Sequence, residues 1–318
     1  MRNIIKRVLA LLSVKVTLIN KKNTLNELGV NTGNADFLPN GAIWLKDFDL
    51  KVNQDRHGYI LRGVRIMYSL RNKAGAKFEL TAADDLLINV NGLIYNIQTW
   101  EELFILNEIF ISGVYNYLTT EPFVLFDIGM NVAYSSLFFA AIPECLAVYS
   151  FEPFQQTFDQ AVHNISLNPE AAKKIHPFNY GLGKDNRQMT VAYDKDIKGN
   201  MGINGIPGYL DRDLTAATEE QIILKDAAAV ISGLISELGT ARPNLVVKMD
   251  CEGSEYDILE SVGDAGLLKA FSVIMMEWHF KGNAEICSRL QNAGYSLFSF
   301  NHHDEMSGML YAFKNKFE

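Results

Sequence analysis

Apolar runs that end in a charged residue recur along the chain from residue 123 onward. They are Phe123–Asp127, Leu146–Glu152 and Leu245–Asp250, and each is followed by a glycine or proline and then by apolar residues at helical spacing. Apolar runs of this length, bounded by turn residues, are typical of strands buried on both faces of a parallel sheet. The alternation of such strands with helices predicts an α/β fold.

The C-terminal part of the chain predicts how this sheet ends. Ser272–Glu277 has the pattern of a further apolar strand, and a helical pattern over Ala284–Ala293 stops at Gly294, as helices often do. The strand patterns YSLFSF and MLYAFK then flank the short polar loop Asn301–Ser307. A parallel crossover needs about a dozen residues, so these strands must pair antiparallel or lie apart. We expect a mostly parallel sheet with an antiparallel last strand.

The first part of the chain has a different character. Residues 27–100 are mixed in pattern, and Asn91-Gly92 between LLINV and LIYNI indicates a hairpin turn. The length of 318 residues suggests about two domains, and 48% apolar content is enough to bury a full core. We expect a smaller α+β accessory or substrate region over residues 1–119 and a larger domain over residues 120–318.

Charge and cysteine content argue against several classes of protein. The formal net charge of −8 disfavours wholesale nucleic-acid binding, because that needs a basic face to neutralise phosphates. Cys145, Cys251 and Cys287 form no C-x-x-C spacing and leave an odd count, which disfavours a disulfide framework or structural zinc. We expect a cytoplasmic protein whose partner is a small molecule or a glycan.

The N-terminus departs from the acidic balance. Residues 1–26 contain six basic residues and no acid, and their apolar run over residues 8–14 is too short to span a bilayer. A basic amphipathic helix can contact anionic lipid, but packing on its own protein is the commoner outcome. We therefore favour a packed helix over membrane contact.

The turn after the first apolar run has the composition of a nucleotide-binding turn. Gly129 lets the backbone approach a ligand, but Asn131 and Ala133 replace the second and third glycines of the G-x-G-x-x-G fingerprint. The acid Asp127 would repel a pyrophosphate and suits a cationic ligand such as an amine or a sulfonium. The alternative is that Asp127 caps the following helix.

The second run ends at Glu152, at the sheet edge where α/β proteins bind ligands. Pro153 follows at a plausible first helical position. An acid at this place can accept both hydroxyls of a ribose, as it does in nicotinamide enzymes, so Glu152 indicates a ribose without naming the cofactor. Its alternative role is that of a solvated acid at a helix start.

The third run carries the most specific motif. Lys248 and Asp250 are expected on one strand face, because side chains alternate with period two, and a central strand tolerates such charges only if they are paired or functional. Ser254–Asp257 has the form of a capping box, which places Glu252 and Gly253 in the turn before a helix. The alternative is a buried Lys–Asp pair that only holds the sheet together.

In order and spacing, DIGMN, FEP, KMDCEGSEYDIL and MEWH resemble the FkbM-type family of S-adenosylmethionine-dependent methyltransferases, over roughly residues 85–315. The K-x-D-x-E-G-x-E pattern from Lys248 to Glu255 is the specific part of the resemblance. It implies a Rossmann-like seven-stranded class I methyltransferase sheet, S-adenosylmethionine as cofactor, and O-methylation of a sugar, glycan or natural product. Met130 and Ala133 depart from the family pattern, and ISGL stands where a T-L-D-like element is expected.

The resemblance also assigns roles at the strand ends. It implies that Asp127 and Gly129 hold the methionine part of the cofactor, Glu152 the ribose, and residues 250–255 the wall between donor and acceptor. The residues expected to bind the cofactor are Asp127, Gly129, Asn131, Ser135, Glu152, Pro153, Asn179, Asp250 and Glu252. Those expected to bind the substrate are Glu255, Glu277 and His302.

A hydroxyl acceptor barely ionises near neutrality, so its methylation needs a general base. His279, just past Glu277 at a strand end, is the leading candidate and Asp250 is the second. Alternatively, His279 only satisfies a backbone carbonyl. No H-x-H spacing is present and we expect no metal. The alternative is a Mg²⁺ or Mn²⁺ site formed by Asp250, Glu252, Glu277 and His279.

Two matters stay open. The glycine-rich stretch over residues 196–213 follows a possible strand at Met189–Tyr193 and is expected to be a long loop, either a substrate loop or a surface insertion. Three rival functions also remain: a nicotinamide-dependent dehydrogenase, which Asp127 and the missing glycines disfavour, a non-catalytic methyltransferase-like binding protein, and an N-methyltransferase.

Overall fold

The computed structural model describes residues 25–30, 32–203, 205, 217–239, 243–302 and 306–315. The chain divides into two compact units, Met1–Gly113 and Val114–Glu318. Sequence patterns place the boundary a few residues later, near residue 119. The expected N-terminal basic helix falls almost wholly on residues 1–24, outside the described part of the chain.

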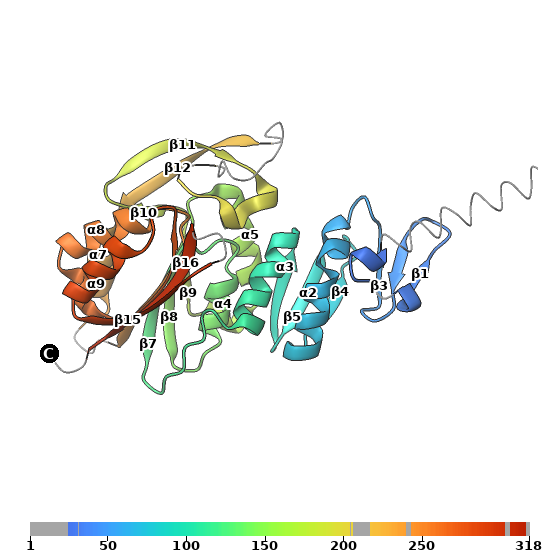
Figure 1. Cartoon of the computed structure of the whole chain (residues 1–318), viewed down its shortest axis with the longest axis horizontal. Coiled ribbons are helices and arrows are strands. Elements are labelled where there is room, and N and C mark those ends of the chain that lie inside the picture. Colours follow the sequence, from blue (N-terminus) through green and yellow to red (C-terminus); the bar gives the residue numbers. More distant parts are fainter. Residues whose placement is uncertain are drawn as a thin grey trace, which may run out of the picture. The chain divides into compact units, whose positions relative to one another are not determined.

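The first unit contains two small antiparallel sheets and two main helices in its described part (Figure 1). The hairpin predicted from Asn91-Gly92 is confirmed, because both residues take a left-handed conformation, with φ of 54° and 88°, between paired strands. The elements of this unit are η1 (Thr32–Asn34), β1 (Ala35–Phe37), β2 (Ile43–Leu45), β3 (Leu50–Val52), α2 (Gly58–Ala74), β4 (Lys77–Leu80), β5 (Leu86–Val90), β6 (Leu93–Ile97), α3 (Trp100–Asn107) and η2 (Glu108–Ser112).

The second unit is built on a seven-stranded sheet with the order β15-β16-β14-β13-β7-β8-β9. Neighbours from β14 through β9 run parallel, whereas β16 is antiparallel to both β14 and β15. These strands are β7 (Phe123–Ile128), β8 (Cys145–Phe151), β9 (Ile175–Phe178), β13 (Asn244–Met249), β14 (Phe271–His279), β15 (Tyr295–Asn301) and β16 (Ser307–Lys314). The expected fold class, with its antiparallel last strand, is confirmed.

Helices cover both faces of this sheet, with α7, α8 and α9 on one side and α4 and α5 on the other (Figure 1). Strands β7 and β13 are buried along almost their whole length, as their continuous apolar runs predict. The helices are α4 (Tyr134–Ala140), α5 (Gln155–Ser166), α6 (Pro169–Ala172), α7 (Ala227–Glu237), α8 (Glu255–Asp264), η5 (Leu267–Ala270) and α9 (Ala284–Asn292).

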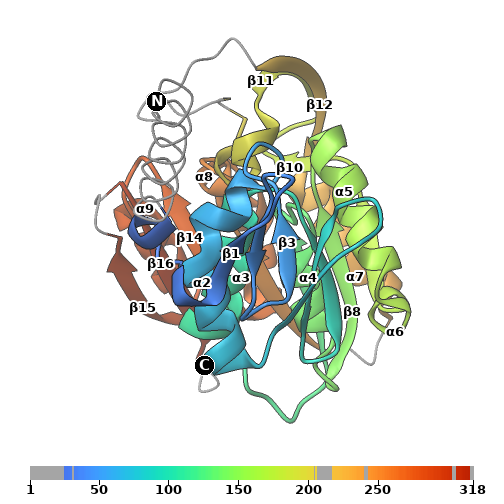
Figure 2. The ribbon, with the colours of Figure 1, turned by 90° about the vertical axis from the view of Figure 1, so that its right-hand side faces the viewer.

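A second, three-stranded sheet with the order β10-β12-β11 lies beyond the carboxyl end of β8 (Figures 1 and 2). Its elements are β10 (Gly181–Gly183), β11 (Arg187–Tyr193) and β12 (Thr218–Asp226). The glycine-rich stretch connects β11 with β12 and begins with the 3-10 helix η3 (Lys195–Asn200), so its first part is ordered structure and not an open loop. Of the remainder, the structure describes residues 201–203 and 205.

No helix within the described residues has the length and apolar content required to cross a bilayer.

Candidate active site

Strand register brings together a buried ion pair at the centre of the sheet, here called the Asp127–Lys248 pair. Asp127 on β7 is the register partner of Lys248 on β13 and of Ser150 on β8. The Lys248 Nζ atom lies 3.2 Å from Asp127 Oδ1, and both side chains are almost fully buried. Burial opposes the ammonium charge, but the neighbouring acids, Asp127 foremost, outweigh it and raise the pKa of Lys248.

The remaining contacts of this pair are also made by protein groups. Ser135 and Ser136, at the start of α4, donate from their hydroxyls to Asp127 Oδ2 at 2.8 and 2.6 Å. Lys248 donates to the carbonyl oxygen of Gly129 at 2.6 Å. The partner of Lys248 is therefore Asp127 and not Asp250, which lies beyond the last residue of β13.

The turn after β7 is held by close packing against the turn after β13. Gly129 has a φ of 81°, and a Cβ atom on it would lie 1.8 Å from the Asp250 carbonyl oxygen. Asn131 and Ala133 also have positive φ, at 51° and 68°. Although the later glycines of the fingerprint are absent, the backbone here adopts the left-handed geometry that glycines usually supply. Met130, the other departure, is buried.

Glu152 joins the turns that follow β7 and β8. Its carboxylate accepts hydrogen bonds from the backbone N–H groups of Asn131 and Phe154, both at 3.0 Å. Burial raises the pKa of Glu152 to about 7 despite these two hydrogen bonds. The amide of Asn179, directly after β9, can donate to the carbonyl oxygens of Glu152 and Pro153 at 3.0 and 3.2 Å.

A small cavity of about 40 Å³ lies where these turns meet. Its lining residues come from the seven-stranded sheet, from the three-stranded sheet and from the turns that follow their strands. They are Ile128, Gly129, Phe151, Glu152, Pro153, Phe154, Gly181, Leu182, Met201, Gly202, Ile203, Leu224, Cys251 and Ser254. A cavity of this size holds a few water molecules, whereas ligand pockets typically measure about 300 Å³ or more. Gly202 covers it closely, since a Cβ atom there would lie 2.2 Å from the Glu252 carbonyl oxygen.

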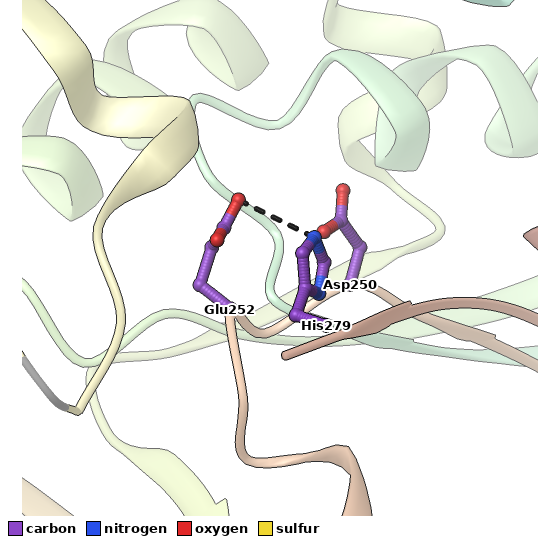
Figure 3. Close-up of side chains that lie close together, drawn as sticks. All are labelled: Asp250, Glu252 and His279. Atoms are coloured by element: carbon purple, nitrogen blue, oxygen red, sulfur yellow. Dashed lines mark ion pairs between the residues drawn. The ribbon is translucent and has the colours of Figure 1, made fainter. Parts of the chain in front are cut away.

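A second group of charges, the Asp250–Glu252–His279 cluster, lies at the ends of β13 and β14 (Figure 3). The His279 ring is buried, with Nδ1 3.0 Å from Glu255 Oε1 and Nε2 3.5 Å from Glu252 Oε1. Nε2 also lies 3.6 Å from Glu277 Oε1. Burial alone would lower the pKa of His279, but the hydrogen bond to Glu255 and the nearby carboxylates of Glu277 and Glu252 raise it to about 12.

The two acids of the cluster are forced toward the neutral form. Burial, followed by repulsion from Glu277, raises the pKa of Asp250 to about 6. Burial also raises the pKa of Glu252 well above its ordinary value. Glu252 has a φ of 51°, and its Oε2 atom is buried without a hydrogen-bond partner among the described residues.

The other predicted substrate residues flank the cluster. Glu255 is fully buried, and its carboxylate accepts from the backbone N–H groups of Cys251 and Gly253 at 3.0 and 2.9 Å. His302 lies with Nδ1 3.3 Å from Glu277 Oε1. Burial favours the neutral acid, but the contacts with the His279 and His302 rings lower the pKa of Glu277 to about 2. The structure thus brings these residues together with both candidate bases.

One expected local structure is absent and several neighbours were not predicted. Helix α8 begins after Ser254 as expected, but the Ser254 side chain makes no capping hydrogen bond to the described residues, and Glu255 bonds the turn instead. Tyr115 lies with its hydroxyl 3.5 Å from Asp250 Oδ2, 135 residues away in sequence. That distance leaves no local signal for Tyr115, whereas the position of Ser136 beside Ser135 could have indicated its contact with Asp127.

The comparison with family models identifies one family. The model of the methyltransferase FkbM domain matches residues 127–297. The AMB antimetabolite synthetase AmbE of Pseudomonas aeruginosa is 24% identical over 220 residues, which are 59% of this chain and 10% of that protein. The chain thus spans about a tenth of the length of this curated relative.

Two of the solved structures that align with this chain are distant from it in sequence. A methyltransferase FkbM from Methylobacillus flagellatus KT aligns with 15% identity and a TM-score of 0.41, over 65% of this chain and 47% of its own. The N-terminal domain of human METTL16, in complex with SAH, aligns with 13% identity and a TM-score of 0.39, over 91% and 93%.

Proposed function

The chain belongs to the FkbM methyltransferase family, and from this premise we propose that it transfers a methyl group from S-adenosylmethionine to a hydroxyl group of a sugar, glycan or natural product. The observation that carries the proposal is the span of the family match. It contains the Gly129 turn, Glu152, the strand end at Asp250 and His279, which the fold gathers at one edge of the sheet.

The chemistry of the residues at this edge suits such a cofactor, although the cavity must widen to admit it. Glu152 lies at the carboxyl end of β8 and lines the cavity, where its carboxylate can accept the hydroxyls of a ribose. We assign Asp127 a positioning role, because its carboxylate is engaged by Lys248 and two serines and supports the Gly129 turn from behind. The Asp250 and Glu277 carboxylates, whose pKa values are about 6 and about 2, place negative charge at this edge near neutral pH, which suits a sulfonium.

The cofactor supplies an electrophilic methyl group, and the protein must align the acceptor and remove its proton. In this reaction the acceptor oxygen forms a bond to the methyl carbon while the carbon–sulfur bond breaks. Asp250 is the candidate for receiving the hydroxyl proton, whereas His279, whose pKa is raised to about 12, already carries its proton near neutral pH and is not available as a base. Both lie at the carboxyl ends of adjacent strands, beside the turn that packs on Gly129.

The choice of a hydroxyl on a small molecule rests on the resemblance stated above and on charge. The formal net charge of −8 disfavours a nucleic-acid acceptor. The relative AmbE is named as an antimetabolite synthetase, which supports a natural-product acceptor. An amine acceptor is the second candidate, because the acid-rich cluster would also attract a cation.

Calorimetry with S-adenosylmethionine and with NAD tests the cofactor. We expect the full chain to bind the first and not the second, and Glu152→Ala to lose this binding. Glu170→Gln, an exposed acid in a surface pair with Lys173, is the control and should bind normally. Binding of NAD alone would refute the proposal.

Transfer of radiolabelled methyl groups to a cell extract tests the reaction. We expect labelling that Glu152→Ala abolishes and Glu170→Gln preserves. Cofactor binding without any labelling would instead favour a non-catalytic binding protein. The chemical stability of the labelled product then separates an ether or ester from a methylated amine.

A further inference from the structure

Acids outnumber bases among the buried and half-buried side chains at the ends of β13 and β14. Four carboxylates, those of Asp250, Glu252, Glu255 and Glu277, surround the single buried imidazole of His279. We propose that Asp250, Glu252 and His279 bind one divalent metal ion, with one oxygen or nitrogen ligand from each. What the ion does for the reaction rests on the function proposed above, but the site itself does not.

The three side chains are close enough to share an ion. One ligand atom from each lies within 4.8 Å of the others (Figure 3). Ligands of an octahedral ion with bonds of about 2.1 Å lie about 3.0 Å apart when adjacent and about 4.2 Å apart when opposite, so the three side chains would have to draw closer by up to about 1–2 Å to share an ion. Glu277 Oε1, 3.6 Å from His279 Nε2, is placed to supply a fourth ligand.

The contacts of His279 are those of a metal-binding histidine. Nδ1 lies 3.0 Å from the Glu255 carboxylate, which is itself fixed by the backbone N–H groups of Cys251 and Gly253. Metal-ligating histidines almost always donate their second ring nitrogen to such a partner, which orients the ring. Nε2 is then directed at Glu252 and Glu277, at 3.5 and 3.6 Å, too far for strong hydrogen bonds.

A second, independent observation supports a cation at this place. Glu252 is only 9% exposed, yet its Oε2 atom has no hydrogen-bond partner among the described residues. A buried carboxylate oxygen without a partner is costly, and native proteins pair such atoms or use them to coordinate metals. An ion between Glu252, Asp250 and His279 would satisfy this atom and offset the excess negative charge.

The ligand set indicates the class of ion. Carboxylates suit Mg²⁺ and Mn²⁺, whereas an imidazole suits transition metals, so the mixed set favours an ion such as Mn²⁺. A bound ion would act as a Lewis acid on the acceptor hydroxyl and lower its pKa. The proton would pass to a carboxylate of the cluster and then to solvent, while the acceptor oxygen gains the methyl group and the carbon–sulfur bond breaks.

Electron paramagnetic resonance of Mn²⁺ added to the chelator-treated full chain tests the site. We expect one Mn²⁺ to bind per chain, and Glu252→Gln and His279→Gln each to weaken binding at least about tenfold. Glu170→Gln should bind like the wild type, because Glu170 is an exposed acid far from the cluster in sequence. Thermal melts of the metal-free variants establish that they are folded.

Three outcomes would overturn the inference: no stoichiometric Mn²⁺ binding, folded variants that bind as tightly as the wild type, or equal weakening by Glu170→Gln. Calorimetry with S-adenosylmethionine in the same preparations separates this result from the proposed function. Cofactor binding and full methyl transfer in the presence of a chelator would leave the proposed function standing and remove the metal's role in the reaction. If the chain binds Mn²⁺ but does not bind S-adenosylmethionine, the metal site stands and the proposed function fails.

Discussion

Two groups of buried charges lie at the ends of neighbouring strands, and they differ in balance. In the Asp127–Lys248 pair each charge meets its opposite, and serine hydroxyls and a backbone carbonyl make further contacts. In the Asp250–Glu252–His279 cluster the acids exceed the bases and Glu252 Oε2 has no partner among the described residues. The difference indicates that the pair supports the architecture, whereas the cluster is arranged to receive a ligand.

Gly129 connects the two groups, so its substitution gives the largest expected effect. Its carbonyl oxygen accepts from Lys248, and its Cα atom faces the Asp250 backbone. In Gly129→Ala the new methyl group would overlap the Asp250 carbonyl, at 1.8 Å, and the positive φ adds further strain. We expect a loss of more than about 5 kcal/mol in the free energy of unfolding, measured by chemical denaturation.

Gly266→Ala is the matched control for this change. Gly266 has a φ of 70°, but open space surrounds the position of its Cβ atom. It should therefore lose only about 1–2 kcal/mol, the cost of the left-handed conformation. Equal losses in the two variants would show that backbone conformation, and not the contact with Asp250, makes Gly129 necessary.

Removing one charge from each group tests the comparison directly. Lys248→Met leaves Asp127 buried without its cation, and we expect it to lower the free energy of unfolding by about 3–5 kcal/mol. In the metal-free protein Glu252→Gln removes an excess acid, and it should change the free energy of unfolding by less than about 1 kcal/mol. Similar losses in both variants, in urea unfolding, would contradict the distinction between the groups.

Glu152 is a third buried acid at a strand end, and it has backbone N–H partners without a cation. Burial raises its pKa from 4.5 to about 7 in the folded chain. At a pH between these values the folded chain keeps a proton on Glu152 that the unfolded chain has lost. The binding of this proton contributes to the free energy of unfolding. Its contribution is complete below about pH 4.5 and is lost as the pH rises through about 7.

The expected pH dependence is measured against Glu152→Gln. Between about pH 4.5 and 8, the free energy of unfolding of the wild type should fall by up to about 3 kcal/mol relative to that of the variant. Parallel pH profiles would mean that the folded chain does not hold Glu152 in its neutral form.

Substitutions at the first residues of helices are expected to have the smallest effect on stability. Ser254 precedes α8 beside the cluster but makes no capping hydrogen bond to the described residues, so Ser254→Ala should change stability by less than about 0.5 kcal/mol. Thr99 caps α3 through a hydrogen bond from the backbone N–H of Glu102, and Thr99→Ala should cost about 1 kcal/mol. If thermal melts showed a larger loss of stability in Ser254→Ala, this result would support the capping box predicted from the sequence.

The fold could be predicted from the sequence because the patterns that specify its strands and turns are local. Apolar runs that end at Asp127 and Glu152 predict buried strands, and Asn91-Gly92 predicts a hairpin because a tight turn needs positive φ. The motif around Lys248 also named the family that the comparison over residues 127–297 shows.

Partners within the site were harder to predict, because they depend on register and on strand ends. Period-two alternation places Lys248 and Asp250 on one face, but β13 ends at Met249, so the alternation does not extend to Asp250. The true partner, Asp127, follows from the register of β7 against β13, which no local pattern encodes. The position of Tyr115 depends likewise on the tertiary fold.

The close packing of Gly202 on Glu252 has a kinetic consequence. A cavity of about 40 Å³ cannot admit a nucleoside, so a ligand of that size can bind there only in the fraction of molecules in which the lining, Gly202 included, has moved apart. The measured affinity is then weaker than the intrinsic affinity by that fraction. At high ligand concentration the observed rate of binding reaches a plateau, set by how often the protein opens and not by how often the two molecules meet.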